Sequence, residues 1–145
     1  MKHIERTLVV QQPPERVWAY LSDFRSTNEW DPGTVLTERT SGDGGVGTVY
    51  RNTSKFLGNE TELEYVVTDV EPGRQIRLRG DNKTVTSYDT ITVEPAGSGT
   101  SVTYLAEFEL HGAAKLATPV MGLPLKKLGD DAEAGLRKAL EGLTA

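Results

Sequence analysis

The sequence predicts an α+β fold in which a seven-stranded antiparallel sheet is covered on one face by a long C-terminal helix. Two observations carry this prediction. Residues 34–111 are rich in Val, Thr, Ile and Tyr, with short Gly-, Asn-, Pro- or Asp-containing connections, as in an antiparallel meander. In the last third, apolar residues recur at three- and four-residue steps from Met121 to Leu143, which is typical of an amphipathic helix.

The N-terminal segment adds one strand and two short helices. A loosely alternating stretch predicts a strand over about residues 3–11, which stops at a Pro-Pro pair. Proline suits the first turn of a helix, and Val17, Leu21 and Phe24 would form one apolar helical face. A second helical turn is expected over residues 26–29, because the Asp-Pro-Gly that follows disfavours its continuation.

The remaining elements complete the order strand, two short helices, six strands, long helix. In the long helix Gly122, Gly129 and Gly135 are weak points, since an interior glycine costs about 1 kcal/mol relative to alanine. Thr118 could cap this helix, and a kink or late start is expected near Pro124. The six further strands are expected at 34–40, 46–56, 60–70, 74–79, 83–94 and 100–111.

Length and composition exclude several classes of protein. At 145 residues the chain has the size of one domain, 1–145, and no apolar run approaches the roughly 20 residues of a membrane helix. A net charge of -5 without a basic stripe disfavours nucleic acid. Without cysteine, and with His3 and His111 far apart, the sequence predicts no metal site and no cofactor. The start lacks the pattern of a secretory signal, so we expect a cytoplasmic protein.

The motif GDGGVG at residues 42–47 matches the glycine spacing of dinucleotide-binding loops. The phosphate-binding version needs a helix after the glycines, whereas a predicted strand follows here. We therefore interpret the motif as a hairpin turn whose glycines supply positive φ angles.

Strand alternation places a carboxylate on an apolar face. In residues 83–94 the inward set would include Ser87 and Asp89 between Val85 and Ile91. A buried carboxylate costs several kcal/mol unless it is paired or its pKa shifts. Asp89 could meet an arginine or water at the sheet edge, or a bulge could turn it outward. Alternatively, it is a polar anchor in a ligand cavity.

Other inward positions are also polar or amphipathic, where a filled core would favour Leu and Ile. An open cavity explains this pattern at least as well as ordinary packing with hydroxyls at the rim. His111 falls outward beside two glutamates, which favours a solvated histidine over a general base. The inward polar and amphipathic set is Tyr50, Asn52, Tyr65, Ser87, Asp89 and Tyr104.

The opening stretch TLVVQQPPERVWAYLSDFRSTNEWDPGTV resembles the start of the SRPBCC or START-like superfamily, in its polyketide cyclase/dehydrase and lipid transport branch. VGTVY and DVEPGRQIRLR are similar to that family's third strand and to its turn before the fifth. The glycine turn GDGGVGT resembles the glycine-rich loop of plant pollen allergens of the same superfamily. The resemblance implies a helix-grip fold, with a curved sheet around the C-terminal helix and a hydrophobic cavity between them.

The resemblance also implies that a small hydrophobic ligand, such as a lipid, sterol or polyketide, binds in this cavity. No catalytic motif can be transferred, and Trp30 is expected in the wall near the cavity's end. The expected ligand-binding residues are Trp30, Tyr50, Asn52, Tyr65, Ser87, Asp89, Tyr104, Phe108, Met121, Leu125 and Leu128.

Two other functions stay open at this point. One is a cyclase, aromatase or dehydratase in which Asp89, with its pKa raised by burial, moves protons at an enolisable carbon. The other is a protein-interaction module that uses a sheet edge or residues 112–124, a segment that could also act as a gate. The sequence predicts neither the ligand's identity nor an oligomeric state.

Overall fold

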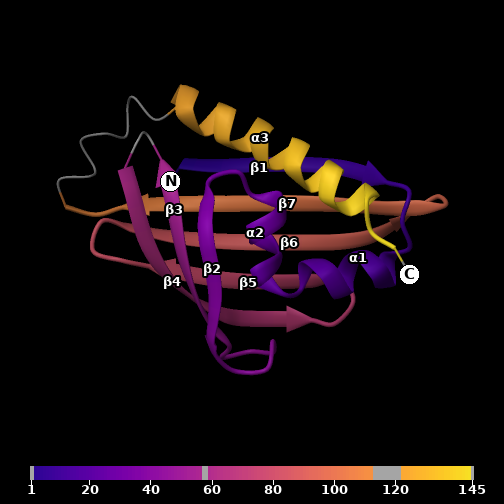
Figure 1. The fold of residues 1–145 in the computed structure, drawn as a ribbon, viewed down its shortest axis with the longest axis horizontal. Coiled ribbons are helices and arrows are strands. Elements are labelled where there is room, and N and C mark those ends of the chain that lie inside the picture. The colour runs from indigo at the N-terminus through magenta and orange to yellow at the C-terminus, as the bar shows by residue number, and fades with distance from the viewer. Residues whose placement is uncertain (1, 57–58, 113–121, 145) are drawn as a thin grey trace.

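The computed structural model describes residues 2–56, 59–112 and 122–144 (Figure 1). The predicted order of elements and the helix-grip arrangement are confirmed. The helices are α1 (Pro14–Leu21), the 3-10 turn η1 (Phe24–Ser26), α2 (Thr27–Trp30) and α3 (Gly122–Glu141). The strands are β1 (Lys2–Val10), β2 (Thr34–Ser41), β3 (Val49–Phe56), β4 (Asn59–Glu71), β5 (Gln75–Asp81), β6 (Val85–Ala96) and β7 (Gly99–Leu110).

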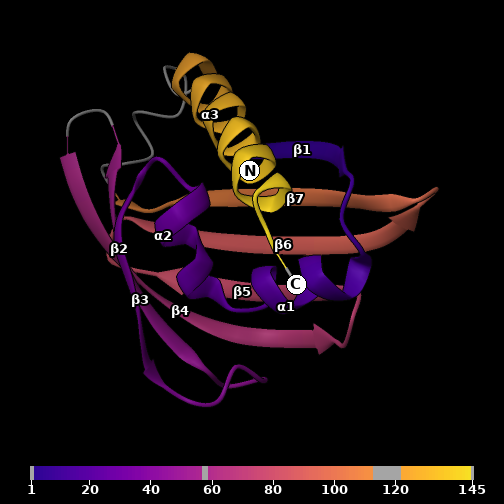
Figure 2. The same ribbon diagram turned by 45° about the vertical axis from the view of Figure 1, so that its right-hand side comes forward.

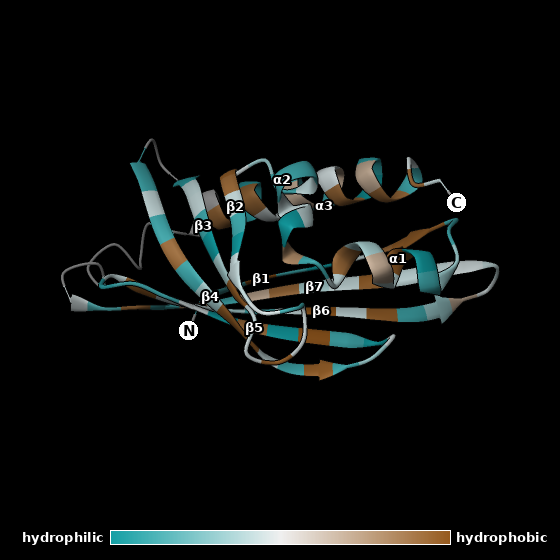
Figure 3. Ribbon diagram, turned by 60° about the horizontal axis from the view of Figure 1, so that its bottom comes forward, coloured by the Kyte–Doolittle hydropathy of each residue, from teal (hydrophilic) through white to brown (hydrophobic). Residues whose placement is uncertain are grey.

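The seven strands form one antiparallel sheet in the order β1-β7-β6-β5-β4-β3-β2. Register shifts interrupt the β2–β3 pairing at Thr34/Leu36 and Arg39/Ser41, and the β4–β5 pairing at Val67/Asp69. Such bulges increase local twist and bend a sheet. The sheet therefore curves, and all three α-helices lie on its concave side (Figures 2 and 3).

The connection between β2 and β3 is the glycine-rich turn. Gly42, Gly44 and Gly47 have φ angles of 91°, 107° and 91°, in the region that residues with a Cβ rarely adopt. The interpretation of this motif as a hairpin turn is confirmed. Because no helix follows the glycines, the geometry that would hold a pyrophosphate is absent from this turn.

The N-terminal helical region differs in one detail from the prediction. Helix α1 ends at Leu21, and Phe24 belongs to the separate turn η1, whose start is capped by Asp23 accepting a hydrogen bond from the Arg25 amide. Val17, Leu21 and Phe24 are nevertheless all buried. The predicted apolar face therefore exists, but it extends over two elements.

Helix α3 is tied to the sheet mainly through β1. The Arg6 guanidinium donates hydrogen bonds to Asp130 at 3.0 Å and to the Lys126 carbonyl at 3.2 Å. At the other end of α3, Gln12 donates to the Leu143 carbonyl at 3.0 Å, which satisfies a group beyond the last helical turn. These contacts hold α3 across the concave face at both ends.

The two halves of α3 have different surroundings. Leu136 and Leu140, in the second half, are buried in the main hydrophobic core together with residues of α1 and the sheet. Leu125, in the first half, belongs to a small separate cluster with Ile4. The main core therefore fills the space under one half of the helix, and a cavity lies under the other.

Two glycines that sequence reasoning treats as weak points of α3 allow close packing instead. A Cβ on Gly129 would lie 2.5 Å from Ile4 Cγ2, and one on Gly135 would overlap the Trp30 carbonyl. The described helix begins at Gly122, so Pro124 falls in its first turn, where proline is tolerated. The proposed cap at Thr118 lies outside the described residues.

Candidate functional site

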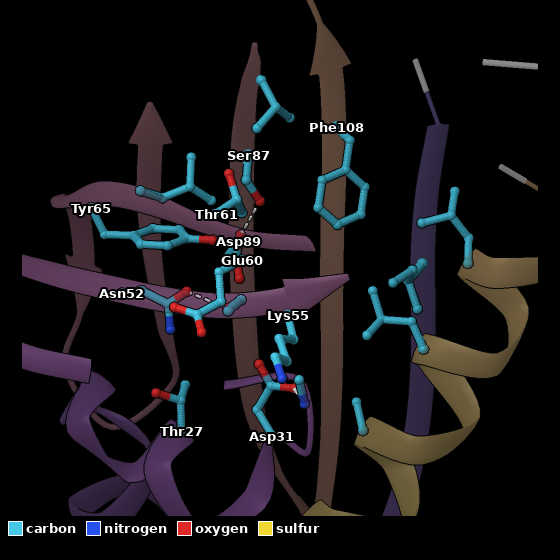
Figure 4. A pocket seen from close by; sticks show the side chains of 18 of the residues that line it. Thr27, Asp31, Asn52, Lys55, Glu60, Thr61, Tyr65, Ser87, Asp89 and Phe108 are labelled. Carbon is cyan, nitrogen blue, oxygen red and sulfur yellow. Dashed lines mark hydrogen bonds between the residues drawn. The ribbon is translucent and has the colours of Figure 1, made fainter. Parts of the chain in front are cut away.

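A cavity of about 430 Å³ lies between the N-terminal half of α3 and the sheet. Side chains from β1, β3, β4, β6, β7 and α3 line it, together with Phe24 of η1 and Thr27 of α2. Figure 4 shows many of these side chains. This volume is in the range of pockets that hold small organic ligands. The wall is mostly apolar and includes Ile4, Leu63, Val85, Phe108, Leu125 and Leu128.

Asp89 is the most deeply buried charged residue of the cavity wall. It is only 3% exposed, yet it lies in the middle of β6 on the concave face. The Ser87 hydroxyl donates to its Oδ1 at 2.6 Å, and the Tyr104 hydroxyl donates to its Oδ2 at 3.0 Å. The Tyr65 hydroxyl lies beside Asp89 and Ser87 as well (Figure 4). Asp89 thus has partners from β6, β7 and β4.

These surroundings shift the acid–base properties of the cluster. Burial raises the pKa of Asp89 from 3.8 to about 6, although hydrogen bonds from Ser87 and Tyr104 oppose this change. Burial, followed by the nearby Asp89 charge, raises the pKa values of Tyr65 and Tyr104 well above their usual range. Near neutral pH the two tyrosines therefore stay protonated, while Asp89 is mostly ionised.

Two of the alternatives considered for Asp89, an arginine partner and a bulge in β6, are not observed among the described residues. No arginine is among its described hydrogen-bond partners, and β6 pairs with β5 and β7 through this position without a register shift. The side chain lines the cavity, and buried and half-buried residues alternate along β6 from Ser87 to Val93. Period-two reasoning therefore located this residue correctly.

A second carboxylate, Asp31, lines the cavity from the loop after α2. It accepts hydrogen bonds from the Gly33 amide at 3.0 Å and from the Thr34 hydroxyl at 2.9 Å. Burial raises its pKa, and its charge also contributes to the raised pKa of Asp89. Two coupled acids therefore face the same enclosed space.

A network of hydrogen bonds between neutral side chains holds the part of the cavity wall that lies between the two acids and η1. The Asn52 side-chain amide donates to the hydroxyls of Thr37 at 2.8 Å and Thr34 at 3.1 Å. Its carbonyl oxygen accepts from Ser54 at 2.6 Å, and the Thr37 hydroxyl also contacts that of Thr27 at 2.7 Å. The network joins α2, β2 and β3, so Asn52 is held in one orientation.

Eight of the eleven predicted ligand-binding residues lie in the cavity wall. Whether each one contacts a ligand stays a prediction. Met121 lies outside the described residues. The eight are Asn52, Tyr65, Ser87, Asp89, Tyr104, Phe108, Leu125 and Leu128.

Trp30 and Tyr50 require a correction, because neither is among the residues that line the cavity. Trp30 is buried behind the wall, where its indole N–H donates to Ser26 and its ring packs edge-on against Tyr104 with centroids 5.2 Å apart. Tyr50 lines a second, smaller pocket of about 260 Å³ beside α1. Elements α1 and η1 cover that part of the concave face, which separates Tyr50 from the main cavity.

Sequence reasoning missed Asp31, Lys55, Phe24 and Leu63 as cavity residues. It interprets Asp31 only as part of a helix-ending Asp-Pro-Gly. Asp31 directly follows Trp30, which sequence reasoning placed near the cavity, but the sequence does not show that the loop containing Asp31 faces the sheet. Lys55 lies on β3 and is exposed, which places it at the cavity mouth.

His111 lies away from the cavity, as its outward register predicts. Its Nε2 is 2.8 Å from the Thr86 hydroxyl, which donates to Asp81 at 2.6 Å. Within the described ranges, no three His, Cys, Asp or Glu side chains are grouped as a metal site would need. Nor does any helix in those ranges have the length and apolar character needed to cross a membrane.

The sheet, the helix across its concave face and the enclosed cavity define a START-like helix-grip protein. The chain belongs to the polyketide cyclase/dehydrase and lipid transport family, which it matches over residues 1–144. Among curated proteins, none matches the sequence.

Solved structures with the same fold have low sequence identity to the chain. TTHA0849 from Thermus thermophilus is 17% identical with a TM-score of 0.82, and the match covers 99% of this chain and all of the other. The Zhui aromatase/cyclase from Streptomyces sp. R1128 is 18% identical with a TM-score of 0.76, covering 97% and 92%. A START superfamily protein from Mycobacterium smegmatis is 20% identical with a TM-score of 0.73, covering 97% and 94%.

Proposed function

We propose that the protein binds a small hydrophobic ligand in the cavity between α3 and the sheet. The observation that carries this proposal is a mostly apolar space of about 430 Å³ with two hydrogen-bonded acids, Asp89 and Asp31, in its wall. The apolar wall supplies affinity at about 25 cal/mol per Å² of ligand surface removed from water. The polar cluster around Asp89 orients the ligand's head group.

The first test is native mass spectrometry of the freshly purified protein, compared with its mass after denaturing extraction. A retained adduct would identify the ligand's chemical class. An apo mass, together with failure to bind a panel of apolar dyes, would contradict the proposal.

A pair of variants in α3 locates the binding site. Leu128→Trp fills the cavity from its roof, so dye binding is expected to fall strongly. Lys127→Trp is the matched control, because the Lys127 side chain is 75% exposed on the outer face of the same helix. Equal dye binding by both variants, with both folded, would mean that the ligand occupies another place.

A second candidate function, proton-transfer catalysis of the cyclase or dehydratase type, is favoured by the Asp89 pKa of about 6. The ionised carboxylate would take a proton from the enolisable carbon of a β-hydroxy ketone. The C–O bond would then break, and the departing hydroxide would take that proton and leave as water. Loss of turnover in Asp89→Asn with ligand binding retained would establish this function, and retained turnover would exclude Asp89 from it.

A further inference from the structure

The polar groups of the cavity wall are unequally available to a ligand. Most hydrogen-bond donors of the wall are already used within the protein. The Ser87 and Tyr104 hydroxyls donate to Asp89, and the Ser54 hydroxyl donates to Asn52. Thr27 donates to the Phe24 carbonyl. An incoming head group that needs donors would have to break one of these bonds.

The Asn52 amide shows the same limitation. An asparagine side chain has two N–H donors, and those of Asn52 go to Thr34 and Thr37. Asn52 thus has no free donor for a ligand, although it lines the cavity.

Acceptors, in contrast, remain open on both acids. A carboxylate has about four acceptor positions; Ser87, Tyr104 and Tyr65 use three of them at Asp89, and Gly33 and Thr34 use two at Asp31. Both carboxylates line the cavity. A head group that donates hydrogen bonds can therefore be satisfied without disturbing the wall.

The charges of the wall favour the same kind of ligand. The described lining residues include three acids, Asp31, Glu60 and Asp89, and one base, Lys55. Lys55 and Glu60 are both exposed at the mouth, where water screens them. The enclosed part of the described wall thus carries negative charge without a buried cation.

We propose that the cavity selects amphiphiles whose polar head is a hydrogen-bond donor, with an alkyl- or arylammonium bound best, and discriminates against carboxylate heads. This inference rests on the proposed ligand-binding function and specifies its ligand class. An ammonium pairs with Asp89 or Asp31 through charge-assisted bonds. A carboxylate in the same place would face two acids of its own sign and few free donors.

The selectivity depends on pH, because burial, with a smaller contribution from a neighbouring charge, raises the pKa of Asp89 to about 6, while the hydrogen-bond donors that face it oppose this rise. The groups that face Asp89 are Ser87 on its own strand, Tyr104 on β7, Tyr65 on β4 and the charge of Asp31 from the loop after α2. Near pH 5 Asp89 is mostly protonated and attracts a cation less. The preference for an amine should therefore decrease from about pH 7.5 to about pH 5.

The test compares decylamine, decanol and decanoate, which share one alkyl chain and differ in head group. Each displaces an apolar dye from the full-length protein, below its micelle concentration, at about pH 7.5 and about pH 5. At the higher pH decylamine is expected to bind roughly 10- to 100-fold more tightly than decanoate, with decanol between them. Acidification should reduce the advantage of decylamine over decanol.

Variants assign the effect to the two acids. Asp89→Asn or Asp31→Asn should lower decylamine affinity about tenfold while changing decanol affinity little. Asp69→Asn is the control, since it removes the same charge from an exposed position on β4. If one of the two variants folds poorly, the other still tests the proposal.

Two negative results are distinguishable. If none of the three compounds binds, the proposed function fails. If decanol binds but decanoate binds as tightly as decylamine, or if neither acid variant reduces decylamine binding, the cavity binds apolar ligands and the inferred selectivity is wrong.

Discussion

Gly135 of α3 lies directly against the backbone carbonyl of Trp30 at the end of α2. The approach is so close that a Cβ at position 135 would overlap the Trp30 oxygen. Trp30 in turn packs edge-on against Tyr104, whose hydroxyl donates to Asp89. The contact between the two helices therefore supports the wall of the cavity.

The contact at Gly135 predicts an unusual effect of alanine. Gly135→Ala should lower the free energy of unfolding by about 2–3 kcal/mol, because the Trp30 backbone must move, although alanine favours helix. Urea denaturation measures the change. Gly142→Ala is the control, since a Cβ there meets only atoms at ordinary contact distances of 3.4 Å or more. A stabilised Gly135→Ala protein would contradict the packing described.

Gly80 has a comparable relationship to Tyr65. It lies opposite Tyr65 in the β4–β5 pairing, and a Cβ at position 80 would be 2.6 Å from the Tyr65 ring. Gly80→Ala should displace this ring from Asp89, which weakens ligand binding and costs about 1–3 kcal/mol of stability. Dye titration combined with urea denaturation separates the two effects. Unchanged affinity would remove Tyr65 from the binding site.

Two buried tyrosines should respond differently to loss of the hydroxyl. The Tyr50 hydroxyl has no hydrogen-bond partner in the described structure, although the Phe24 backbone lies near enough to affect its pKa. Tyr50→Phe should therefore change stability by less than about 0.5 kcal/mol, or increase it. Tyr104→Phe removes a donor to Asp89 and should cost about 1.5–3 kcal/mol. Equal losses in urea denaturation would refute the assignment of partners.

The raised pKa of Asp89 makes stability depend on pH. Folded Asp89 holds its proton more tightly than the unfolded chain does, so its contribution is full below about pH 4 and is lost as the pH rises to about 6. A pKa raised from 3.8 to about 6 corresponds to about 3 kcal/mol.

Asp89→Asn should remove this part of the pH profile. Between about pH 4 and pH 6.5 the free energy of unfolding of the unaltered protein should fall by about 2 kcal/mol relative to that of the variant, since part of the full effect lies below pH 4. Urea denaturation at several pH values gives both curves, and Asp69→Asn should follow the unaltered protein. Parallel curves for Asp89→Asn would show that the pKa of Asp89 is not raised.

Strand alternation predicted much of the site, because side chains two residues apart share a face whatever else the fold does. Ser87, Asp89, Tyr104 and Phe108 were located in this way. Alternation does not show which part of the sheet's concave face lies in the cavity and which part is covered by a helix. Tyr50 shares the concave face with Asn52, but α1 and η1 separate it from the cavity.

Residues whose role depends on contacts distant in sequence were harder to predict. The sequence presents Asp31 only as part of a helix end, since its approach to the sheet depends on how α2 packs on α3. The predicted strand over 74–79 stops before Gly80, whereas in the structure Gly80 continues β5 and makes room for Tyr65. Helix propensity likewise predicts that Gly135 destabilises α3, but it does not show that Gly135 packs against the Trp30 backbone.

The pairing of β1 with β7 has a consequence for how the chain folds during synthesis. Lys2 lies opposite Phe108, and Val10 lies opposite Thr100, so the first strand has no neighbour in the sheet until the last strand has been made. The pairs from β2 to β7 form locally through short connections, whereas the β1–β7 pair must close a long loop. Helix α3 follows later still and forms the roof of the cavity. A ligand can therefore be enclosed only after translation has passed α3, and until then the apolar concave face is open to water and to chaperones.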